Sequence, residues 1–364
     1  MFVPAEFAKD LLHGGMACTT CHGGDPSGTT RKAAHAGLHP DPSQTRPQET
    51  CGPCHPGIVA DHARSLHATE AGKRHAVEVR AGGPLAGDLD AAYRAQCGTC
   101  HASCGQCHVS SPANAGGGLL ESHRFVRSPP NMLTCTGCHG TRVMKEYRGQ
   151  NAGIPADVHS GQGMQCTDCH DGAEMHGTGA SDLTHRYQVP TAPSCEECHP
   201  DDASFRQQPF HQPHRDGDGA LTVSCQVCHA APYKHCNDCH VSVSGDGLPQ
   251  SEVNPPDHVS MLAVKIGYNP RRDALHPQRF VTLRHVPAAP ATFSYYGENL
   301  LPAFGAAPTW VLSTPHTIRL RTDQAWDCTT SCHGRRDLFL GPADLPPGEE
   351  DANASVVVAV PPGS

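Results

Sequence analysis

Residues 97–108 read CGTCHASCGQCH, which places two copies of the pattern Cys-x-x-Cys-His within twelve residues. The same pattern accounts for nine of the ten cysteine pairs, and all 20 cysteines of the chain belong to a pair. The tenth pair has one more residue between its cysteines, and a histidine follows it as well. The motifs are Cys18, Cys21 and His22; Cys51, Cys54 and His55; Cys97, Cys100 and His101; Cys104, Cys107 and His108; Cys135, Cys138 and His139; Cys166, Cys169 and His170; Cys195, Cys198 and His199; Cys225, Cys228 and His229; Cys236, Cys239 and His240; and Cys328, Cys332 and His333.

The histidine after each pair decides what the cysteines do. A disulfide scaffold or paired zinc knuckles would use the cysteines but would leave a histidine after every pair unexplained. Attachment of haem c needs all three residues, because two thiols add to the vinyl groups of one porphyrin and the adjacent imidazole binds the iron. The sequence therefore predicts ten covalently bound haem c groups, with these cysteines as attachment sites and these histidines as proximal ligands.

Composition indicates that side chains alone do not fill the interior. Only 37% of the 364 residues are apolar and 5% are aromatic, whereas the chain has 33 Pro and 37 Gly. Disorder does not account for 20 Cys and 27 His in fixed patterns. We expect a mostly irregular, loop-rich fold with short α-helices, built around a chain of ten haems, with a small β-containing haem-free segment near the C-terminus.

The spacing of the motifs suggests how the chain is organised. First cysteines follow one another at 33, 46, 7, 31, 31, 29, 30, 11 and 92 residues, and the four middle steps resemble a repeat in which neighbouring haems follow chain order. The compressed motif pairs at 97–108 and 225–240 predict closely stacked haems. We expect a nine-haem winding region at 1–240, a haem-free cap at 241–327, and the last haem with the C-terminal tail at 328–364.

Local patterns predict a few regular elements. Helical spacing favours short helices on several CxxCH turns and over 58–70 and 89–96. β-Branched and aromatic residues favour strands at 280–283 and 292–296, and Pro-Gly clusters favour loops at 116–118, 188–194 and 286–291. The haem-free segment is interpreted as a folded cap that leads to the last haem, in preference to a substrate domain.

Each iron needs a second axial ligand, and 17 histidines remain for ten irons. This supply predicts ten low-spin haems with two histidine ligands each, which relay electrons and leave no iron open to substrate. No lysine replaces a proximal histidine, so we predict no catalytic residue and no enzyme activity. The predicted distal ligands are His13, His35, His67, His123, His159, His176, His185, His214, His285 and His316. The competing histidines are His39, His62, His75, His211, His235, His258 and His276.

Covalent haem implies export of the apoprotein, so the expected location is extracytoplasmic, in the periplasm or at the cell surface. No export signal is visible in Met1–Asp10, and we expect the numbering to begin near the mature end. The run Val356–Val360 is too short to span a bilayer. The formal charge of −9 makes nucleic acid an improbable partner and favours redox proteins with basic docking surfaces, or extracellular electron acceptors.

The chain resembles large multihaem c-type cytochromes of the cytochrome c3-like group. The resemblance lies in the fragments CGTCHASCGQCHVS, DVHSGQGMQCTDCH, SCQVCHAAPYKHCNDCH and RHVP. It implies bis-histidine haems in a continuous chain. Some members of that group polymerise into extracellular filaments in which a histidine of one subunit ligates a haem of the next.

Three functions therefore stay open at the level of sequence. An electron carrier needs only the haem chain. A filament subunit of identical chains predicts a terminal haem without an intrachain ligand and apolar or β-rich ends, such as Ser355–Val360, that meet the next subunit. A multihaem reductase predicts one five-coordinate iron in a cleft.

Overall fold

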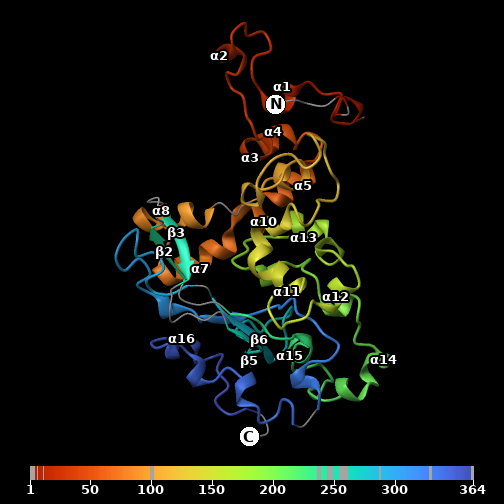
Figure 1. The fold of residues 1–364 in the computed structure, drawn as a ribbon, viewed down its shortest axis with the longest axis vertical. Helices are drawn as coiled ribbons and strands as arrows, with labels where there is room; N and C mark the ends of the chain where they lie inside the picture. The colour runs from red at the N-terminus through yellow and green to blue at the C-terminus, as the bar shows by residue number, and fades with distance from the viewer. Residues whose placement is uncertain are drawn as a thin grey trace. The chain divides into compact units, whose positions relative to one another are not determined.

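A computed structural model describes residues 5, 7–10, 12–98, 102–235, 239–243, 249–253, 261–286, 288–327 and 330–361. Short helices dominate it (Figure 1). The α-helices are α1 (Cys18–His22), α2 (Arg31–Ala34), α3 (Pro42–Thr45), α4 (Pro47–Thr50), α5 (Pro56–His62), α6 (Leu66–Thr69), α7 (Ala71–Ala81), α8 (Gly87–Gln96), α9 (Cys104–His108), α10 (Cys135–His139), α11 (Lys145–Tyr147), α12 (Val158–Gly161), α13 (Gly172–His176), α14 (Ala203–Arg206), α15 (Cys225–His229) and α16 (Glu350–Asn353). The strands are β1 (Tyr233–Lys234), β2 (Cys239–Val243), β3 (Pro249–Val253), β4 (Leu262–Ala263), β5 (Ile266–Tyr268), β6 (Phe280–His285) and β7 (Trp310–Leu312).

The chain forms two compact units that interleave along the sequence. Unit 1 comprises Met1–Gly72, Cys100–Thr141 and Gln165–Ala192, and unit 2 comprises Lys73–Thr99, Arg142–Met164 and Pro193–Ser364. These limits differ from the sequence-based boundaries at 240 and 327, because residues distant in the sequence are grouped in each unit.

Most of the described motifs begin a turn of helix. Four CxxCH motifs are the five-residue helices α1, α9, α10 and α15, and two others open as 3-10 turns at Cys166–Asp168 and Cys195–Glu197. A helical turn brings residues three and four apart onto one face, so both thiols and the imidazole of a motif project together. This arrangement confirms the prediction of short helices on several CxxCH turns.

Unit 1 contains five complete motifs but few buried apolar side chains. Its buried hydrophobic residues, among those described, are Val59, Ala180, Leu183, Tyr187 and Val189. Polar contacts tie α9 to α3, since Ser103 Oγ donates to the Asp41 carboxylate at 3.1 Å and the Gly105 amide donates to Ser43 Oγ at 2.7 Å. A conventional apolar core is therefore thin in this unit.

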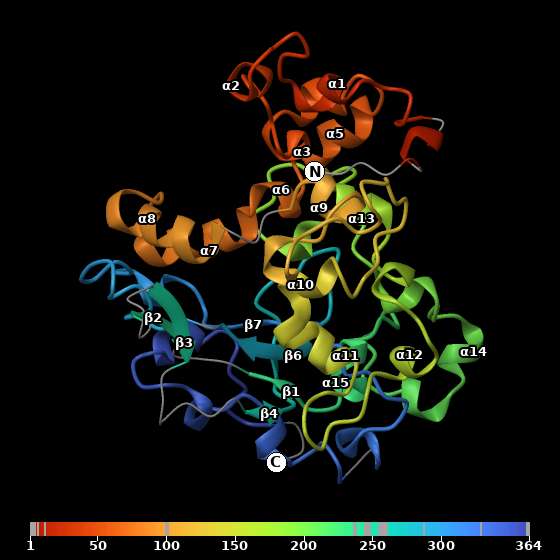
Figure 2. The ribbon, with the colours of Figure 1, turned by 45° about the horizontal axis from the view of Figure 1, so that its top comes forward.

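Unit 2 holds the larger apolar core, around an antiparallel sheet in the order β5-β6-β7, of which Figure 2 labels β6 and β7. Strand β6 is buried on both faces, with Val281 1% and Thr282 0% exposed. Val356 and Val358 are buried as well, and the Tyr268 amide donates to the Val356 carbonyl at 3.0 Å. Val360, by contrast, is 69% exposed, and the use of this run as a contact with a neighbouring subunit stays a prediction.

Some local predictions are confirmed and others are wrong. Helix α8 confirms the prediction at 89–96, and β6 confirms the strand at 280–283. The predicted helix at 58–70 is two helices, because the Ser65 side chain caps the start of α6 by accepting from the Ala68 amide. The predicted strand at 292–296 is wrong: this segment is a series of turns in which Phe293 packs against the core residues of α8.

A buried ion pair joins α11 to β6 in unit 2. Glu146 is fully buried, and its carboxylate accepts from Arg284 at 2.5 Å, from the Lys234 amide at 3.2 Å and from the His316 amide at 3.3 Å. Removing one partner of such a pair leaves an uncompensated charge in the interior.

We expect Glu146→Gln to lower the free energy of unfolding by about 3–5 kcal/mol, because the Arg284 guanidinium would stay buried without its counter-charge. Denaturant unfolding followed by circular dichroism measures this. The matched control is Glu121→Gln, which removes an exposed partner of Arg124 and should change stability by less than about 0.5 kcal/mol. Equal effects of the two substitutions would contradict the role assigned to Glu146.

Candidate haem-ligand site

Proximal histidines face remote histidines in both units. Seven such pairs occur among the described residues, with ring centres 5.6–6.4 Å apart. In unit 1 the pairs are His55 with His13 (6.4 Å), His22 with His123 (5.7 Å), His139 with His67 (6.4 Å) and His108 with His176 (6.2 Å). In unit 2 they are His199 with His159 (6.3 Å), His229 with His211 (6.2 Å) and His333 with His214 (5.6 Å).

The spacing of these rings fits a shared metal ion. A nitrogen ligand lies about 2.0 Å from a first-row metal ion and roughly 1.2 Å from the centre of its own ring, so two rings on opposite sides of one ion would have centres about 6.4 Å apart. Ordinary aromatic pairs also span about 4.5–7 Å, so distance alone is not specific. The composition of the pairs is specific, because each of the seven joins one motif histidine to one histidine outside the motifs.

Hydrogen bonds orient several motif rings for this role. The Nδ1 atoms of His22, His108 and His229 donate to the backbone carbonyls of His39, Val126 and Arg319 at 2.9, 2.7 and 2.9 Å. A carbonyl oxygen only accepts, so these rings carry their proton on Nδ1 and keep Nε2 as the unprotonated nitrogen. An imidazole ligand of a metal has this arrangement.

Burial keeps several of the facing rings neutral. It lowers the pKa of His67, His176 and His214 below the ordinary value of a histidine. The neutral imidazole is the form that binds a metal ion, whereas the protonated ring has no lone pair to offer.

Thiols of different motifs lie next to one another within each unit. In unit 1 a hydrogen bond with Cys104 lowers the pKa of Cys51 to about 6, and one with Cys166 lowers that of Cys135 to about 6. In unit 2 the corresponding contact lowers the pKa of Cys195 and joins it to Cys225. Because each porphyrin edge would be bonded to the thiols of its motif, these contacts would bring the edges of neighbouring haems together.

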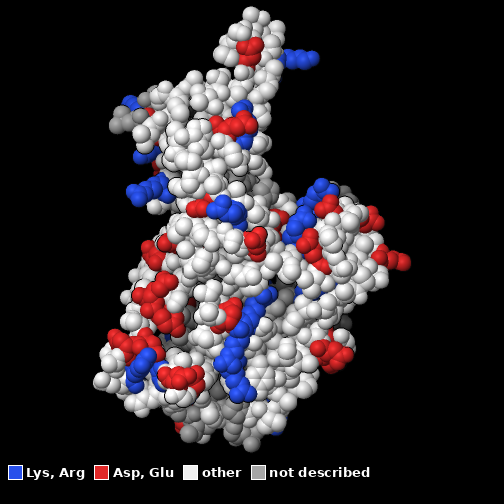
Figure 3. Space-filling model, turned by 180° about the vertical axis from the view of Figure 1, so that it is seen from behind, with Lys and Arg blue, Asp and Glu red and all other residues white. Residues whose placement is uncertain are grey.

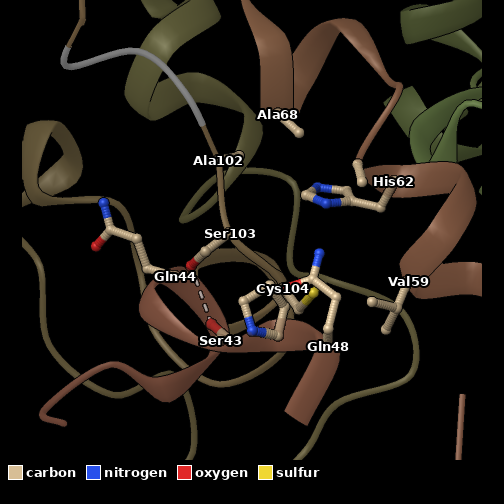
Figure 4. Close-up of a pocket in the computed structure, with 11 residues that line it drawn as sticks. Ser43, Gln44, Gln48, Val59, His62, Ala68, Ala102, Ser103 and Cys104 are labelled. Carbon is tan, nitrogen blue, oxygen red and sulfur yellow. Dashed lines mark hydrogen bonds between the residues drawn. The ribbon is translucent and has the colours of Figure 1, made fainter. Parts of the chain in front are cut away.

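A cavity of about 140 Å³ opens beside the Cys104 thiol in unit 1 (Figure 4). Val59 and Ala68 form part of its apolar wall, and the His62 ring lies on its border. The hollow is much smaller than a porphyrin, so it would hold at most part of a group bonded to this thiol.

The arrangement differs from what a disulfide or zinc scaffold requires. No disulfide joins two of the described cysteines. Within the same residues, no group of three or more His, Cys, Asp or Glu side chains is assembled as a metal site, whereas a structural zinc site needs four protein ligands.

Six of the ten predicted distal histidines face a motif histidine: His13, His67, His123, His159, His176 and His214. The other four lie elsewhere. His35 is exposed, and its Nδ1 donates to the Arg31 carbonyl at 2.6 Å. The His185 ring centre lies 6.2 Å from that of Tyr187. His285 Nε2 lies 3.0 Å from the Glu349 carboxylate, and the His316 amide donates to the Glu146 carboxylate. The geometry at His285 does not favour a ligand role, because Glu349 engages the nitrogen that would face an iron.

Sequence reasoning ranked His211 only as a competitor, yet it faces His229. The sequence HQPH at 211–214 is the signal that was available, since it supplies two histidines shortly before the motif at Cys225. Of the remaining motif histidines, His170 is held by Glu174 at 2.7 Å, while His101 and the His240 side chain lie outside the described residues. The attachment residues Cys100, Cys236 and Cys328 and the competitor His258 also lie outside them, as does the side chain of Cys239.

The face of the molecule in Figure 3 carries acidic and basic side chains in small mixed groups, separated by larger areas without charge. No helix in the described part of the chain is long and apolar enough to cross a membrane.

Comparison with protein-family models, with curated proteins and with solved structures found no match to this chain.

We expect His211→Ala to convert one iron per chain from low spin to high spin, because the ring facing His229 would be lost. Electron paramagnetic resonance of the oxidised holoprotein measures the change. The control is His276→Ala, whose ring lies 3.3 Å from the Asp273 carboxylate, and this variant should keep the parent spectrum. A low-spin spectrum unchanged by His211→Ala would show that His211 is not a ligand.

Proposed function

We propose that this chain is an extracytoplasmic electron-transfer protein that carries ten covalently bound c-type haems, each with two histidine ligands. The observation that carries the proposal is the set of seven pairs in which a motif histidine faces a histidine from outside the motifs. Independent support comes from unit 1, which contains five complete motifs but only five buried apolar side chains among its described residues. So small an apolar core is what we expect where bound porphyrins fill the interior.

Haem, when bound, supplies a one-electron iron couple at each motif. The chain supplies thiols that fix each porphyrin, imidazoles that close both faces of the iron, and hydrogen bonds that hold the imidazoles in place. Two histidine ligands leave no position for substrate, so this ligand set favours transfer of electrons over chemistry on a bound molecule.

Contacts between neighbouring thiols support transfer along the motifs in chain order. In unit 1 the Cys21 thiol lies near Cys51, and the Cys107 thiol lies near Cys135. Together with the contacts of Cys51 with Cys104 and of Cys135 with Cys166, these neighbours support an order of the five complete motifs of the unit that follows the sequence. The contact of Cys51 with Cys104 passes over the motif at 97–101. Short separations between porphyrin edges are what sequential electron transfer requires.

The partners of such a protein would be redox proteins or extracellular electron acceptors. Covalent attachment of haem accompanies export, which places the proposed function outside the cytoplasm. The formal charge of −9 would favour partners with basic docking surfaces.

A reductive titration of the purified holoprotein tests the proposal. We expect ten electrons to be taken up reversibly per chain, and carbon monoxide to leave the spectrum of the reduced protein unchanged because histidine occupies both axial positions. A stoichiometric carbon monoxide complex would instead indicate an open iron and a reductase. A chain produced with the haem-attachment machinery that shows no haem absorption would contradict the proposal altogether.

A further inference from the structure

Three of the candidate ligand rings have a carboxylate beside Nδ1. The Asp10 carboxylate lies 3.6 Å from His13 Nδ1, beyond hydrogen-bond distance, whereas two other rings are hydrogen-bonded to a carboxylate. His22, His108 and His229 donate from Nδ1 to uncharged backbone carbonyls. His159 instead lies with Nδ1 2.9 Å from the Asp157 carboxylate, and His170 lies with Nδ1 2.7 Å from the Glu174 carboxylate.

The Asp157 carboxylate is held in place by the backbone around it. Its side chain is 3% exposed, and besides the His159 ring it accepts from the His159 amide at 2.9 Å and from the Ile318 amide at 2.7 Å. These three contacts fix the position of the carboxylate beside the His159 ring. The His159 ring, in turn, faces the motif histidine His199.

Glu174 lies on the short helix α13, which serves two motifs of unit 1. Its side chain is 15% exposed and reaches back one helical turn to the His170 ring. The last residue of the same helix, His176, faces His108. The Asp171 side chain fixes the start of the helix by accepting from the Glu174 amide at 3.0 Å.

A carboxylate on the outer nitrogen of an axial imidazole changes the iron that the imidazole binds. The negative charge makes the ring a stronger donor and favours the more positive, oxidised iron. The effect is stronger where the carboxylate is shielded from water. A neutral carbonyl at the same position has a smaller effect, because it carries only a partial charge.

On the basis of the proposed function, we infer that Asp157 and Glu174 are positioning residues that lower the reduction potentials of two haems, those of the motifs ending in His199 and His170. These are the seventh and sixth motifs in sequence order.

The variants Asp157→Asn and Glu174→Gln test this inference, because each keeps the size of the side chain and removes its charge. The matched controls are Glu197→Gln and Asp168→Asn, which remove the same charge from exposed positions inside the same two motifs. The readouts are the haem content per chain, the low-spin electron paramagnetic resonance signal and a spectroelectrochemical titration.

We expect each test variant to keep ten low-spin haems and to move one tenth of the titration curve to higher potential, and the double variant to move two tenths. The control variants should shift the curve much less. Ten low-spin haems with unchanged titration curves would overturn the inference while the proposed function stands. Absence of haem from the parent protein would overturn the proposed function itself. If the Asp157→Asn protein does not accumulate, the titration of Glu174→Gln alone tests the inference. Glu174 lies nearer the surface, so its substitution should disturb folding less.

Discussion

The pairing of a motif histidine with a histidine far along the chain is the interaction on which the proposed architecture depends. His22 faces His123, and His214 faces His333. If one iron joins each pair, every pair closes a loop of chain, most of them long, and each closure removes conformational freedom from the unfolded state. In unit 1 this constraint would compensate for a thin apolar core, since bound porphyrins would occupy the volume that side chains leave.

Short segments of chain position histidines that belong to, or face, more than one motif. Helix α13 positions Glu174 against His170 and His176 against His108. In unit 2 the Ile318 amide holds the Asp157 carboxylate, which holds His159, while the next carbonyl, that of Arg319, accepts from His229. A displacement of either segment would therefore alter two irons together. The region interpreted from sequence as a haem-free cap thus supplies the support for ligands of neighbouring motifs.

The motif half of each histidine pair could be predicted from sequence, because the pattern Cys-x-x-Cys-His is local. The motifs identify the candidate proximal histidines without any knowledge of the fold. Distal ligands depend on the path of long loops, which local pattern does not determine. His211 and His214 are close in sequence, yet they face different motifs, and His285 is engaged by Glu349 from the last helix of the chain. The same limit applies to the fold: α8 was predictable from its periodicity, whereas the turns at 292–296 arise from packing of Phe293 against α8.

The central claim is that paired histidines bind each haem iron from both sides. Near-infrared magnetic circular dichroism of the oxidised holoprotein tests it most directly, because the position of the charge-transfer band identifies the two axial ligands of low-spin ferric haem. The account predicts bis-histidine intensity equal to ten haems per chain. A histidine–methionine band, a stoichiometric high-spin fraction, or intensity for substantially fewer than ten haems would contradict it.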